Sequence, residues 1–339
     1  MDVDAMSRVL TVNPGSSSLK VSVVDAGTTL GEWAESDWDG MPDPAEVEAV
    51  GPVDAIAVRF VHGGDRTGPV VLDEAVAQDL RRLVPMAPIH QPRSLSMVRA
   101  LRNWWPDVPI VACFDTSFHT GLPPAASTYP IPVEWTRKFG VRRYGFHGLS
   151  CANALRTTAE TLGRRAGEVA MICCHLGSGV SVTAIDGGRS VDTSMGFTPL
   201  DGVPMATRPG ALDPGLLLYL AREIPLEALE DGLNHHSGLA GLSGTNGDLR
   251  EVLAARAQGS ADADVAVRVY LHRLRREIAA ARTSLPRLDA LVLTGGVAEH
   301  QPGLLDELAT GLEFLGVDPI VTPAREDLEM ARQTEETLN

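Results

Sequence analysis

The chain has 339 residues, a formal net charge of −15, 44% hydrophobic residues and 22% charged residues. This length allows two domains with separate cores, and the composition is that of a globular enzyme. The acidic balance argues against a nucleic-acid partner, because phosphate backbones are held by basic surfaces. A small phosphorylated ligand is still compatible with it, since such a ligand needs only local donors.

The sequence carries no signature of membrane insertion or secretion. No apolar run approaches the roughly 20 residues that cross a bilayer, and the first four residues, MDVD, lack a basic flank. None of the cysteines forms a C-x-x-C pair: Cys113, Cys151, Cys173 and Cys174. We therefore expect a cytoplasmic protein with no membrane partner and with buried, reduced thiols.

The first predicted element is a β-hairpin in residues 9–27, VLTVNPGSSSLKVSVVDAG. Alternating Val and Ser residues predict two strands, and the Gly/Ser segment between them predicts a tight turn. Backbone N–H groups and hydroxyls in residues 13–20 can cradle phosphate oxygens, with Lys20 adding positive charge. A polar hairpin tip without a ligand is equally consistent with this segment. The spacing does not fit the P-loop pattern.

Apolar runs typical of buried strands then alternate with segments of helical apolar spacing. The expected strands are 55–61, 110–114 and 288–294, and the expected helices are 73–84, 94–104, 150–162, 263–281 and one from about Pro302. Pro- and Gly-rich connections are expected at 37–52 and 121–132. Strands that alternate with helices favour an α/β protein whose sheets are covered by helices.

A second hairpin pattern in residues 171–188, MICCHLGSGVSVTAIDGG, repeats the first one. Each copy is a β-rich run, a Gly/Ser turn, and a second β-rich run that ends in Asp and Gly. One hairpin arises easily by chance, but two copies in one chain favour a duplicated domain. We expect the two hairpins to face a shared cleft, with the HLGSG turn as a second phosphate cradle.

Single polar residues in unusual places are further site candidates. Arg59 lies inside an apolar strand, AIAVRFV, and a buried guanidinium needs either a structural carboxylate or an anionic ligand. Both alternatives are open. His90, Asp115 and His147 are expected at loops or strand ends, where sites gather, although a lone histidine there is more often structural. Arg208 follows a Pro-rich loop that should hold it rigidly.

Several longer strings occur in the order VNPGSSSLK, RFVHGG, APIHQP, FDTSFH, RRYGFHG, CHLGSG, VDTSMGFTPLDGVPMATRPGALDP, GLSGTNGDLR, LTGGVAEH and EDLEMARQT. With these strings the sequence resembles the acetate kinase family over nearly its whole length. RRYGFHG together with DTSMGFTPL is the most specific part. The resemblance implies an α/β fold of two actin-like (ribonuclease H-like) domains, with mixed sheets flanked by helices and an active-site cleft between them. The implied domains are 1–117 plus 326–339 and 118–325, the second binding the nucleotide and forming a homodimer.

The resemblance also implies a reaction. It is the reversible, Mg²⁺-dependent transfer of a phosphoryl group between ATP and acetate, giving acetyl phosphate and ADP, with Mn²⁺ as a possible substitute. A carboxylate oxygen is already a nucleophile, so direct in-line transfer requires no strong general base. Two alternatives are kept open. One is a kinase for propionate or butyrate, or with a donor other than ATP. The other is a catalytically weak actin-like regulatory protein.

Roles follow by resemblance for the matching positions. Asn13 and Glu326 would hold the metal. Arg59 and Arg208 would grip the carboxylate and the moving phosphoryl group, His147 would donate to an equatorial oxygen, Asp115 would orient the acetate side, and His90 would support the pocket. The acyl pocket would comprise Val61, Ile89, Phe146 and Pro199 beside Arg59. The nucleotide would contact Ser16, Ser18, Lys20, His175, Leu176, Gly177, Ser178, Gly179, Asp248, Leu249, Arg250, Gly296, Val297, Ala298, Glu299 and His300.

Departures from the family pattern gather on the nucleotide side. Ser178 replaces the usual Asn, and GVAEH replaces the usual G-I-G-E-N loop, so that Ala298 adds a methyl group where the backbone is expected to approach the nucleotide or to take a positive φ. Cys151 stands where His is common, and the stretch between Asp25 and Arg59 is shorter than usual. These changes suggest the hypothesis that another purine nucleotide or pyrophosphate serves as donor.

Overall fold

The computed structural model describes residues 8–15, 18–36, 38 and 50–339. Contacts divide the chain into two compact units. Unit 1 is Met1–Thr120, Phe146–Asn153 and Arg325–Asn339, and unit 2 is Gly121–Gly145 and Ala154–Ala324. The domain boundaries expected from the sequence fall after residue 117 and before residue 326. The contact-based division also places the segment Phe146–Asn153 in unit 1.

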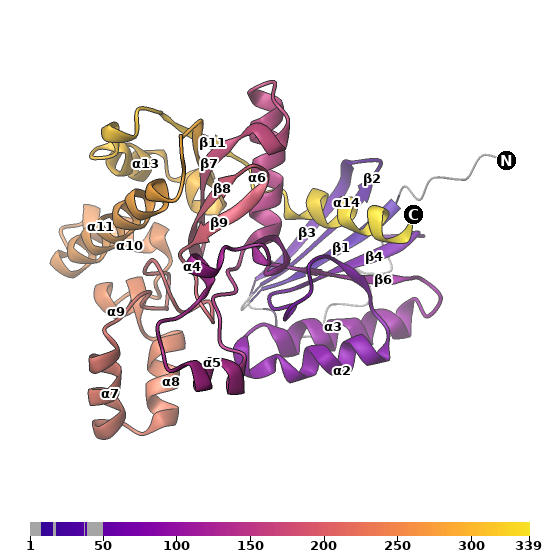
Figure 1. Ribbon diagram of the computed structural model, residues 1–339, viewed down its shortest axis with the longest axis horizontal. Helices are drawn as coiled ribbons and strands as arrows, with labels where there is room; N and C mark the ends of the chain where they lie inside the picture. The colour runs from indigo at the N-terminus through magenta and orange to yellow at the C-terminus, as the bar shows by residue number, and fades with distance from the viewer. Residues whose placement is uncertain (1–7, 16–17, 37, 39–49) are drawn as a thin grey trace. The chain divides into compact units, whose positions relative to one another are not determined.

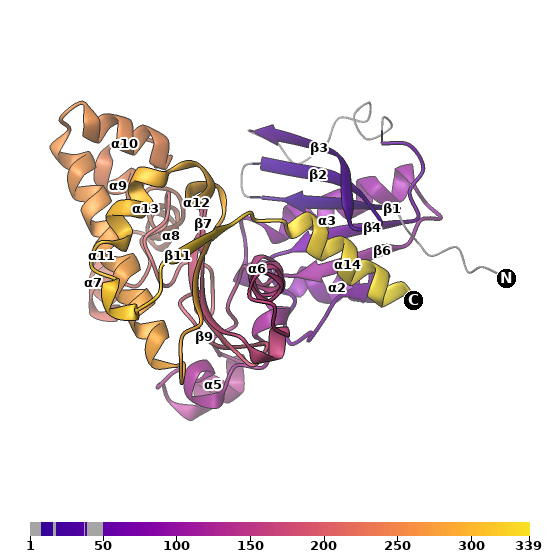
Figure 2. The same cartoon turned by 90° about the horizontal axis from the view of Figure 1, so that it is seen from above.

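Unit 1 is built on a six-stranded mixed sheet in the order β3-β2-β1-β4-β6-β5. Its strands are β1 (Arg8–Pro14), β2 (Ser18–Asp25), β3 (Thr28–Ser36), β4 (Ala55–Phe60), β5 (Val70–Val71) and β6 (Ile110–Phe114). The first three form an antiparallel meander and lie side by side in Figure 2, whereas β1, β4 and β6 run parallel.

Helices cover both faces of this sheet (Figure 1). Its helices are α2 (Glu74–Arg82), η1 (Val84–Met86), α3 (Gln91–Trp104), η2 (Ser117–His119), α14 (Glu326–Leu338) and the first part of α6 (Gly148–Thr161). Alternate strand residues enter different cores, because successive side chains point to opposite faces. Leu10 and Ile56 pack in the cluster that includes residues of α2 and α3, whereas Val9 and Ala57 pack with Met330 of α14.

Unit 2 contains a five-stranded sheet in the order β11-β10-β7-β8-β9. Its strands are β7 (Ala170–Leu176), β8 (Val180–Asp186), β9 (Arg189–Thr193), β10 (Ala290–Thr294) and β11 (Pro319–Thr322). Its helices, besides the rest of α6, are α4 (Pro124–Ser127), α5 (Val133–Phe139), η3 (Ala166–Glu168), α7 (Pro214–Glu223), α8 (Leu226–His235), α9 (Gly238–Ser243), α10 (Leu249–Ala257), α11 (Ala261–Thr283), α12 (Gly296–His300), α13 (Pro302–Ala309) and η4 (Glu313–Leu315). Helix α11 begins where the Ser260 hydroxyl caps the N–H of Ala263 at 3.2 Å, and it packs on β7 and β8.

The two sheets share one topology. In unit 1 the antiparallel meander β1-β2-β3 is extended by β4 and β6, which run parallel to β1. In unit 2 the meander β7-β8-β9 is extended in the same way by β10 and β11. The two hairpins recognised in the sequence occupy equivalent positions in these sheets. The duplication predicted from them is confirmed.

Most predicted strands and helices occur within a few residues of their expected ends. One expectation about local structure was wrong: residues 296–300 form the short helix α12 rather than a loop. Helix α3 begins at Gln91, three residues before its expected start, and His90 lies in the turn before it as the N-cap residue. Most of the expected connection 37–52 lies outside the described residues. All four cysteines are buried and free, in agreement with the expected burial.

In the described part of the chain, no helix combines the length and the apolar character needed to cross a bilayer.

Candidate active site

A polar network lies at the carboxyl ends of the parallel strands of unit 1. Asn13 is on β1, Arg59 is on β4, and Asp115 directly follows β6. Strand alternation places all three on the face that α14 covers, because Val9, Ala57 and Val111 on the same strands pack against that helix. Glu326 is the first residue of α14. Residues from four distant segments therefore meet at the sheet edge where α/β proteins commonly bind ligands.

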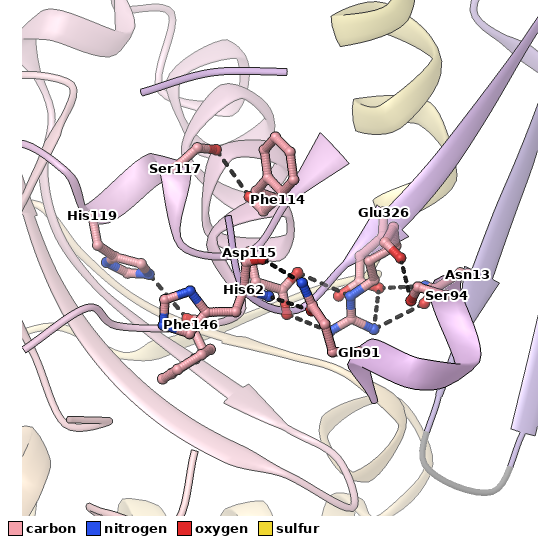
Figure 3. A network of polar contacts seen from close by, with 11 residues as sticks. Asn13, His62, Gln91, Ser94, Phe114, Asp115, Ser117, His119, Phe146 and Glu326 are labelled. Carbon is pink, nitrogen blue, oxygen red and sulfur yellow. Dashed lines mark hydrogen bonds and ion pairs between the residues drawn. The ribbon is translucent and has the colours of Figure 1, made fainter. Parts of the chain in front are cut away.

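Arg59 is the centre of this network, and Figure 3 labels its partners Asn13, Asp115 and Glu326. Its Nε and Nη2 donate to the two carboxylate oxygens of Asp115 at 2.9 and 2.6 Å. Its Nη1 donates to Asn13 Oδ1 at 2.9 Å and lies 3.5 Å from Glu326 Oε2. Of the two alternatives left open by the sequence, the structure shows the carboxylate pairing. The bidentate fork also fixes the plane of the guanidinium.

The ionisation of this pair is shaped by burial and by charge. Burial acts to lower the pKa of Arg59, but the Asp115 and Glu326 carboxylates outweigh it and raise that pKa above its usual range. Burial raises the pKa of Asp115, while the Arg59 guanidinium and the backbone N–H of His147 act to lower it. Because the guanidinium keeps its proton, Asp115 serves as its counter-ion and as an anchor for the His147 backbone.

The turn of residues 146–148 brings His147 to Asp115. Its backbone is left-handed, with φ 58° at His147. The next amide, Gly148 N–H, donates to the Asp115 carbonyl at 2.9 Å. A Cβ at position 148 would lie 2.2 Å from that carbonyl oxygen, so the close approach requires glycine. This explains why the RYGFHG string places glycine directly after the histidine.

Arg208 in unit 2 has a contrasting environment. The residue is only 9% exposed, and its Nη1 donates to the Pro199 carbonyl at 2.7 Å. Its contacts within the described ranges include no carboxylate, and burial lowers its pKa to about 10. The loop is held by a bond from Met205 N–H to the Arg208 carbonyl at 2.9 Å. A positive guanidinium is thus buried without a counter-ion.

Three segments expected to bind the nucleotide lie near one another in unit 2. The Ser178 carbonyl at the tip of the second hairpin accepts from Ala206 N–H at 3.1 Å. Gly247, just before α10, approaches the Ala206 carbonyl so closely that a Cβ would lie 2.2 Å from it. Gly295, before α12, approaches the Leu176 carbonyl in the same manner, at 2.7 Å. The hairpin tip, the start of α10 and the start of α12 are therefore neighbours.

The individual side chains of these segments have diverse surroundings. Asp248 caps α10 by accepting from Arg250 N–H at 2.9 Å, and the Arg250 guanidinium folds back onto the Asp248 carboxylate. Ser178 and His300 are exposed. Ala298 is buried within α12, and the positive φ of 94° belongs to Gly295. The expectation that residue 298 takes a positive φ was wrong, because that residue is helical.

The remaining candidates are divided between the units. Lys20 is exposed and lies opposite Asn13 in the β1–β2 ladder, and the Ser18 carbonyl accepts from Gly15 N–H at 2.6 Å. Ser16 lies outside the described residues. For the expected acyl pocket, Val61 and Phe146 are buried and Ile89 is half-buried, all in unit 1, whereas Pro199 belongs to unit 2. His90, at the N-terminus of α3, is half-buried.

Two buried histidines, to which the sequence analysis gave no role, contact Phe146 in the turn of residues 146–148. His119 Nε2 is 2.9 Å from the Phe146 carbonyl oxygen. The His62 ring meets the Phe146 ring edge-on, with 5.8 Å between centroids, and its Nδ1 accepts from Gly64 N–H at 3.0 Å. Burial lowers the pKa of each to about 4. His62 directly follows the apolar residues Phe60 and Val61, which is the signal that could have indicated its burial, whereas the polar string FDTSFH carries no such signal for His119.

The expected metal ligands lie in contact with each other. Asn13 Nδ2 donates to Glu326 Oε2 at 2.6 Å. An amide oxygen and a carboxylate fit Mg²⁺, which takes oxygen ligands and usually completes its shell with water and substrate phosphates. No group of three His, Cys, Asp or Glu side chains that could hold a metal is found in the described residues. The donors therefore fit a cation that is shared with a phosphorylated substrate, and such a cation would replace contacts that Arg59 now makes.

Comparisons with known proteins agree with this architecture. The model of the Acetokinase family matches residues 43–336. Acetate kinase of Synechococcus sp. (strain JA-2-3B'a(2-13)) is 43% identical over 295 residues, covering 85% of this chain and 72% of that protein. Acetate kinase of Leifsonia xyli subsp. xyli is 39% identical over 390 residues, covering 97% of this chain and 98% of that protein.

Solved structures show the same relationship. The crystal structure of Porphyromonas gingivalis acetate kinase has a TM-score of 0.88 and 29% identity, and the match covers 98% of this chain and 100% of that one. The crystal structure of a propionate kinase from Francisella tularensis has a TM-score of 0.89 and 29% identity, and the match covers 98% of this chain and 100% of that one. These neighbours, together with the duplicated topology, confirm two actin-like domains. The chain belongs to the acetokinase family, whose members are kinases that transfer a phosphoryl group to a carboxylate.

Proposed function

We propose that this chain is an acetate kinase that transfers a phosphoryl group reversibly between ATP and acetate, giving acetyl phosphate and ADP. The observation that carries the proposal is the buried Arg208 guanidinium, which no carboxylate among its described contacts neutralises. Burying an unpaired charge is costly, and an anionic substrate or a phosphoryl group in transfer would supply the missing partner. The family membership and the names of the relatives support acetate as that substrate.

The residues of unit 1 suit the chemistry of the transfer. A phosphoryl group in flight spreads negative charge over three equatorial oxygens. Arg59 is held in a fixed plane by Asp115, and His147 is held beside it by the same carboxylate, so both can present donors without reorganising. Asp115 acts as a positioning residue rather than as a base, since both its oxygens are engaged by Arg59. Direct in-line transfer is the resulting mechanism.

Asn13 and Glu326 would hold the divalent cation, Mg²⁺ or Mn²⁺. When bound, the cation would neutralise charge on the nucleotide phosphates. Lys20 lies opposite Asn13 on the exposed side of the ladder and would add positive charge toward the same phosphates. Ser16 and Ser18 remain proposed members of this first cradle. His90 remains a proposed support of the acyl pocket.

The donor is proposed to bind in unit 2. The hairpin tip 175–179 and the start of α10 approach the loop at Ala206, and the start of α12 approaches the hairpin at Leu176. The methyl group of Ala298 points into the unit, so it does not occupy the space of a ligand at the surface. This favours ATP over the hypothesis of a different donor. The exposed His300 and Ser178 remain the residues at which donor preference would be set.

A hydroxamate assay tests substrate and donor together. Acetate, propionate and butyrate are each offered with ATP, GTP and pyrophosphate, and acyl phosphate is trapped with hydroxylamine. We expect the highest kcat/KM with acetate and ATP. One methylene changes selectivity by about 1–3 kcal/mol, so a preference for propionate, as in the name of the Francisella neighbour, would be visible. No acyl phosphate with any pair, from folded protein with Mg²⁺, would reject the kinase and leave the regulatory alternative.

The exposed apolar side chains of α7 and α8 support a proposed homodimer through unit 2. Leu216, Leu218, Tyr219 and Leu226 are 42 to 65% exposed, and apolar patches of this kind mark association surfaces. Sedimentation of the wild type should give a dimer mass, and Leu218→Asp should shift it toward the monomer. Leu30→Asp is the matched control, because Leu30 is 60% exposed on β3 of unit 1. A monomer at all concentrations would reject the dimer.

A further inference from the structure

His119 lies directly behind the turn that carries His147. It ends η2, the short helix that follows Asp115, and it is fully buried. Its Nε2 lies 2.9 Å from the Phe146 carbonyl oxygen, and a dashed line in Figure 3 marks this contact. A carbonyl oxygen can only accept, so His119 is the donor and carries its proton on Nε2. The imidazole is neutral at physiological pH, because burial lowers its pKa to about 4.

The turn needs this support because its backbone is strained. In the described part of the chain, His147 and Ala26 are the residues other than glycine with positive φ. Such a conformation costs about 1–2 kcal/mol for an L-residue, and it persists only when its surroundings over-determine it. Ala26 is exposed in the β2–β3 turn. His147, in contrast, is buried at the site.

Two successive peptide groups of the turn make three hydrogen bonds to residues outside it. The His147 N–H donates to the Asp115 carboxylate, and the Gly148 N–H donates to the Asp115 carbonyl. The third contact is the bond from His119 to the Phe146 carbonyl. Asp115 therefore accepts from the N–H groups of both peptides, and His119 donates to the carbonyl of the first, so the peptide group between Phe146 and His147 is held from both of its sides.

We propose that His119 is a positioning residue for phosphoryl transfer, acting through its hydrogen bond to the Phe146 carbonyl to hold His147 beside Asp115 and the Phe146 ring in the acyl pocket. The inference rests on the proposed role of His147. It makes the contact between His119 and Phe146 a determinant of kcat, although His119 touches neither reactant. The His62 ring supports the other side of the same residue, because it meets the Phe146 ring edge-on.

Matched substitutions at position 119 test the bond. In His119→Gln the amide nitrogen can reach the position of Nε2, whereas in His119→Asn it reaches only the position of Nδ1. We expect His119→Asn to lower kcat by about 10- to 100-fold, because a displacement of 1 Å can cost about 100-fold. His119→Gln should retain kcat to within about threefold, and KM for the nucleotide should stay unchanged in both.

A control in the same helix, η2, separates the general loss of a buried hydrogen bond from the specific loss of the bond that positions Phe146 and His147. Ser117→Ala removes another buried bond, from Ser117 Oγ to the Phe114 carbonyl at 2.9 Å, without touching Phe146. It should lower thermal stability as His119→Asn does and leave kcat unchanged. If Ser117→Ala and His119→Asn lower kcat equally, or if His119→Gln is no better than His119→Asn, the inference is wrong.

The role of His147 is tested separately with His147→Asn, since Asn tolerates positive φ. A large loss of kcat in this variant supports the proposed function, and adding His119→Asn to it should then cause no further loss. An unchanged kcat in His147→Asn would reject the proposed role of His147. A loss in His147→Asn with a normal kcat in His119→Asn would reject only the inference about His119.

Discussion

The two arginines proposed to grip the substrate are both largely buried, yet their surroundings are opposite. Arg59 in unit 1 is paired with Asp115 and lies near Glu326, and these carboxylates raise its pKa. Arg208 in unit 2 has a carbonyl oxygen as its described partner, and burial lowers its pKa. One guanidinium is therefore paired with carboxylates, and the other has no carboxylate among its contacts in the described part of the chain, where the proposed anionic substrate would be its counter-ion.

This difference separates two contributions to catalysis. A paired guanidinium gives a fixed geometry, because its fork is already engaged. An unpaired and desolvated guanidinium gives a strong interaction with developing negative charge, because little water has to be displaced at the moment of reaction. Substituting either residue should reduce activity. Only the substitution of Arg59 should reduce the free energy of unfolding.

Arg208→Met is expected to have the largest effect on activity. Arginines that stabilise the charge of a phosphoryl group in transfer are worth about 10³- to 10⁵-fold in kcat, so acyl phosphate formation should fall at least about 10³-fold. The free energy of unfolding should stay the same or increase, because an unpaired buried charge has been replaced by an apolar side chain. Hydroxamate kinetics and urea unfolding of the same preparations measure both quantities.

Inorganic phosphate gives the matching control for Arg208. It should raise the melting temperature of the wild type, since a ligand that binds only the folded state stabilises it by mass action, and the increase should be lost in Arg208→Met. A variant that loses stability and still responds to phosphate would show that Arg208 has a structural role.

Arg59→Met should reduce both activity and stability. It leaves the Asp115 and Glu326 carboxylates without their guanidinium, and breaking a buried pair by removing one partner costs about 3–5 kcal/mol. Denaturant unfolding should show this loss. In the double variant Arg59→Met/Asp115→Asn part of the stability should return, because the stranded charge is removed as well. Equal unfolding free energies for the Arg59 and Arg208 variants would contradict the comparison.

The sequence alone predicted the strand that carries Arg59, but it did not show whether a carboxylate or an anionic ligand is the partner of the Arg59 guanidinium. The run AIAVRFV predicts β4 through its apolar residues, which depend on local pattern. The partner Asp115 lies 56 residues away, and Asn13 meets Glu326 across 313 residues. Such pairings arise from the parallel order of β1, β4 and β6 and from the position of α14. Local pattern does not show these pairings: the resemblance implied that Asn13 and Glu326 share a metal, and the assembled sheet shows the contacts themselves.

The predictions of some local features were wrong or missing for a different reason. Residues 296–300 were expected to be a loop because the resemblance matches GVAEH to the G-I-G-E-N loop of the family, but Gly295 provides the turn and residues 296–300 form α12. His62 and His119 received no role because a histidine in sequence does not reveal its burial. Both are fully buried around Phe146, which depends on the fold of the whole unit.

The smallest expected effect is a difference between the two units in how much stability each loses as the pH falls. Because burial lowers the pKa values of His62 and His119 to about 4, the unfolded chain, with histidine pKa values near 6.5, takes up these protons first. Their stability contribution is complete above about pH 6.5 and is lost as the pH falls toward 4, by at most about 3 kcal/mol for each histidine. The histidines of unit 2 are exposed or half-buried, so unit 1 should open first.

Hydrogen exchange between pH 7 and 4.5 measures this difference strand by strand. Protection of β1, β4 and β6 should fall before that of β7, β8 and β10, and His119→Gln should reduce the pH dependence of unit 1. His272→Gln, on the exposed side of α11, is the matched control and should change nothing. Carboxylates also titrate in this range, so the diagnostic quantity is the difference between wild type and variant. If both units lose protection together in His119→Gln as in the wild type, the buried imidazoles do not set the acid sensitivity of unit 1.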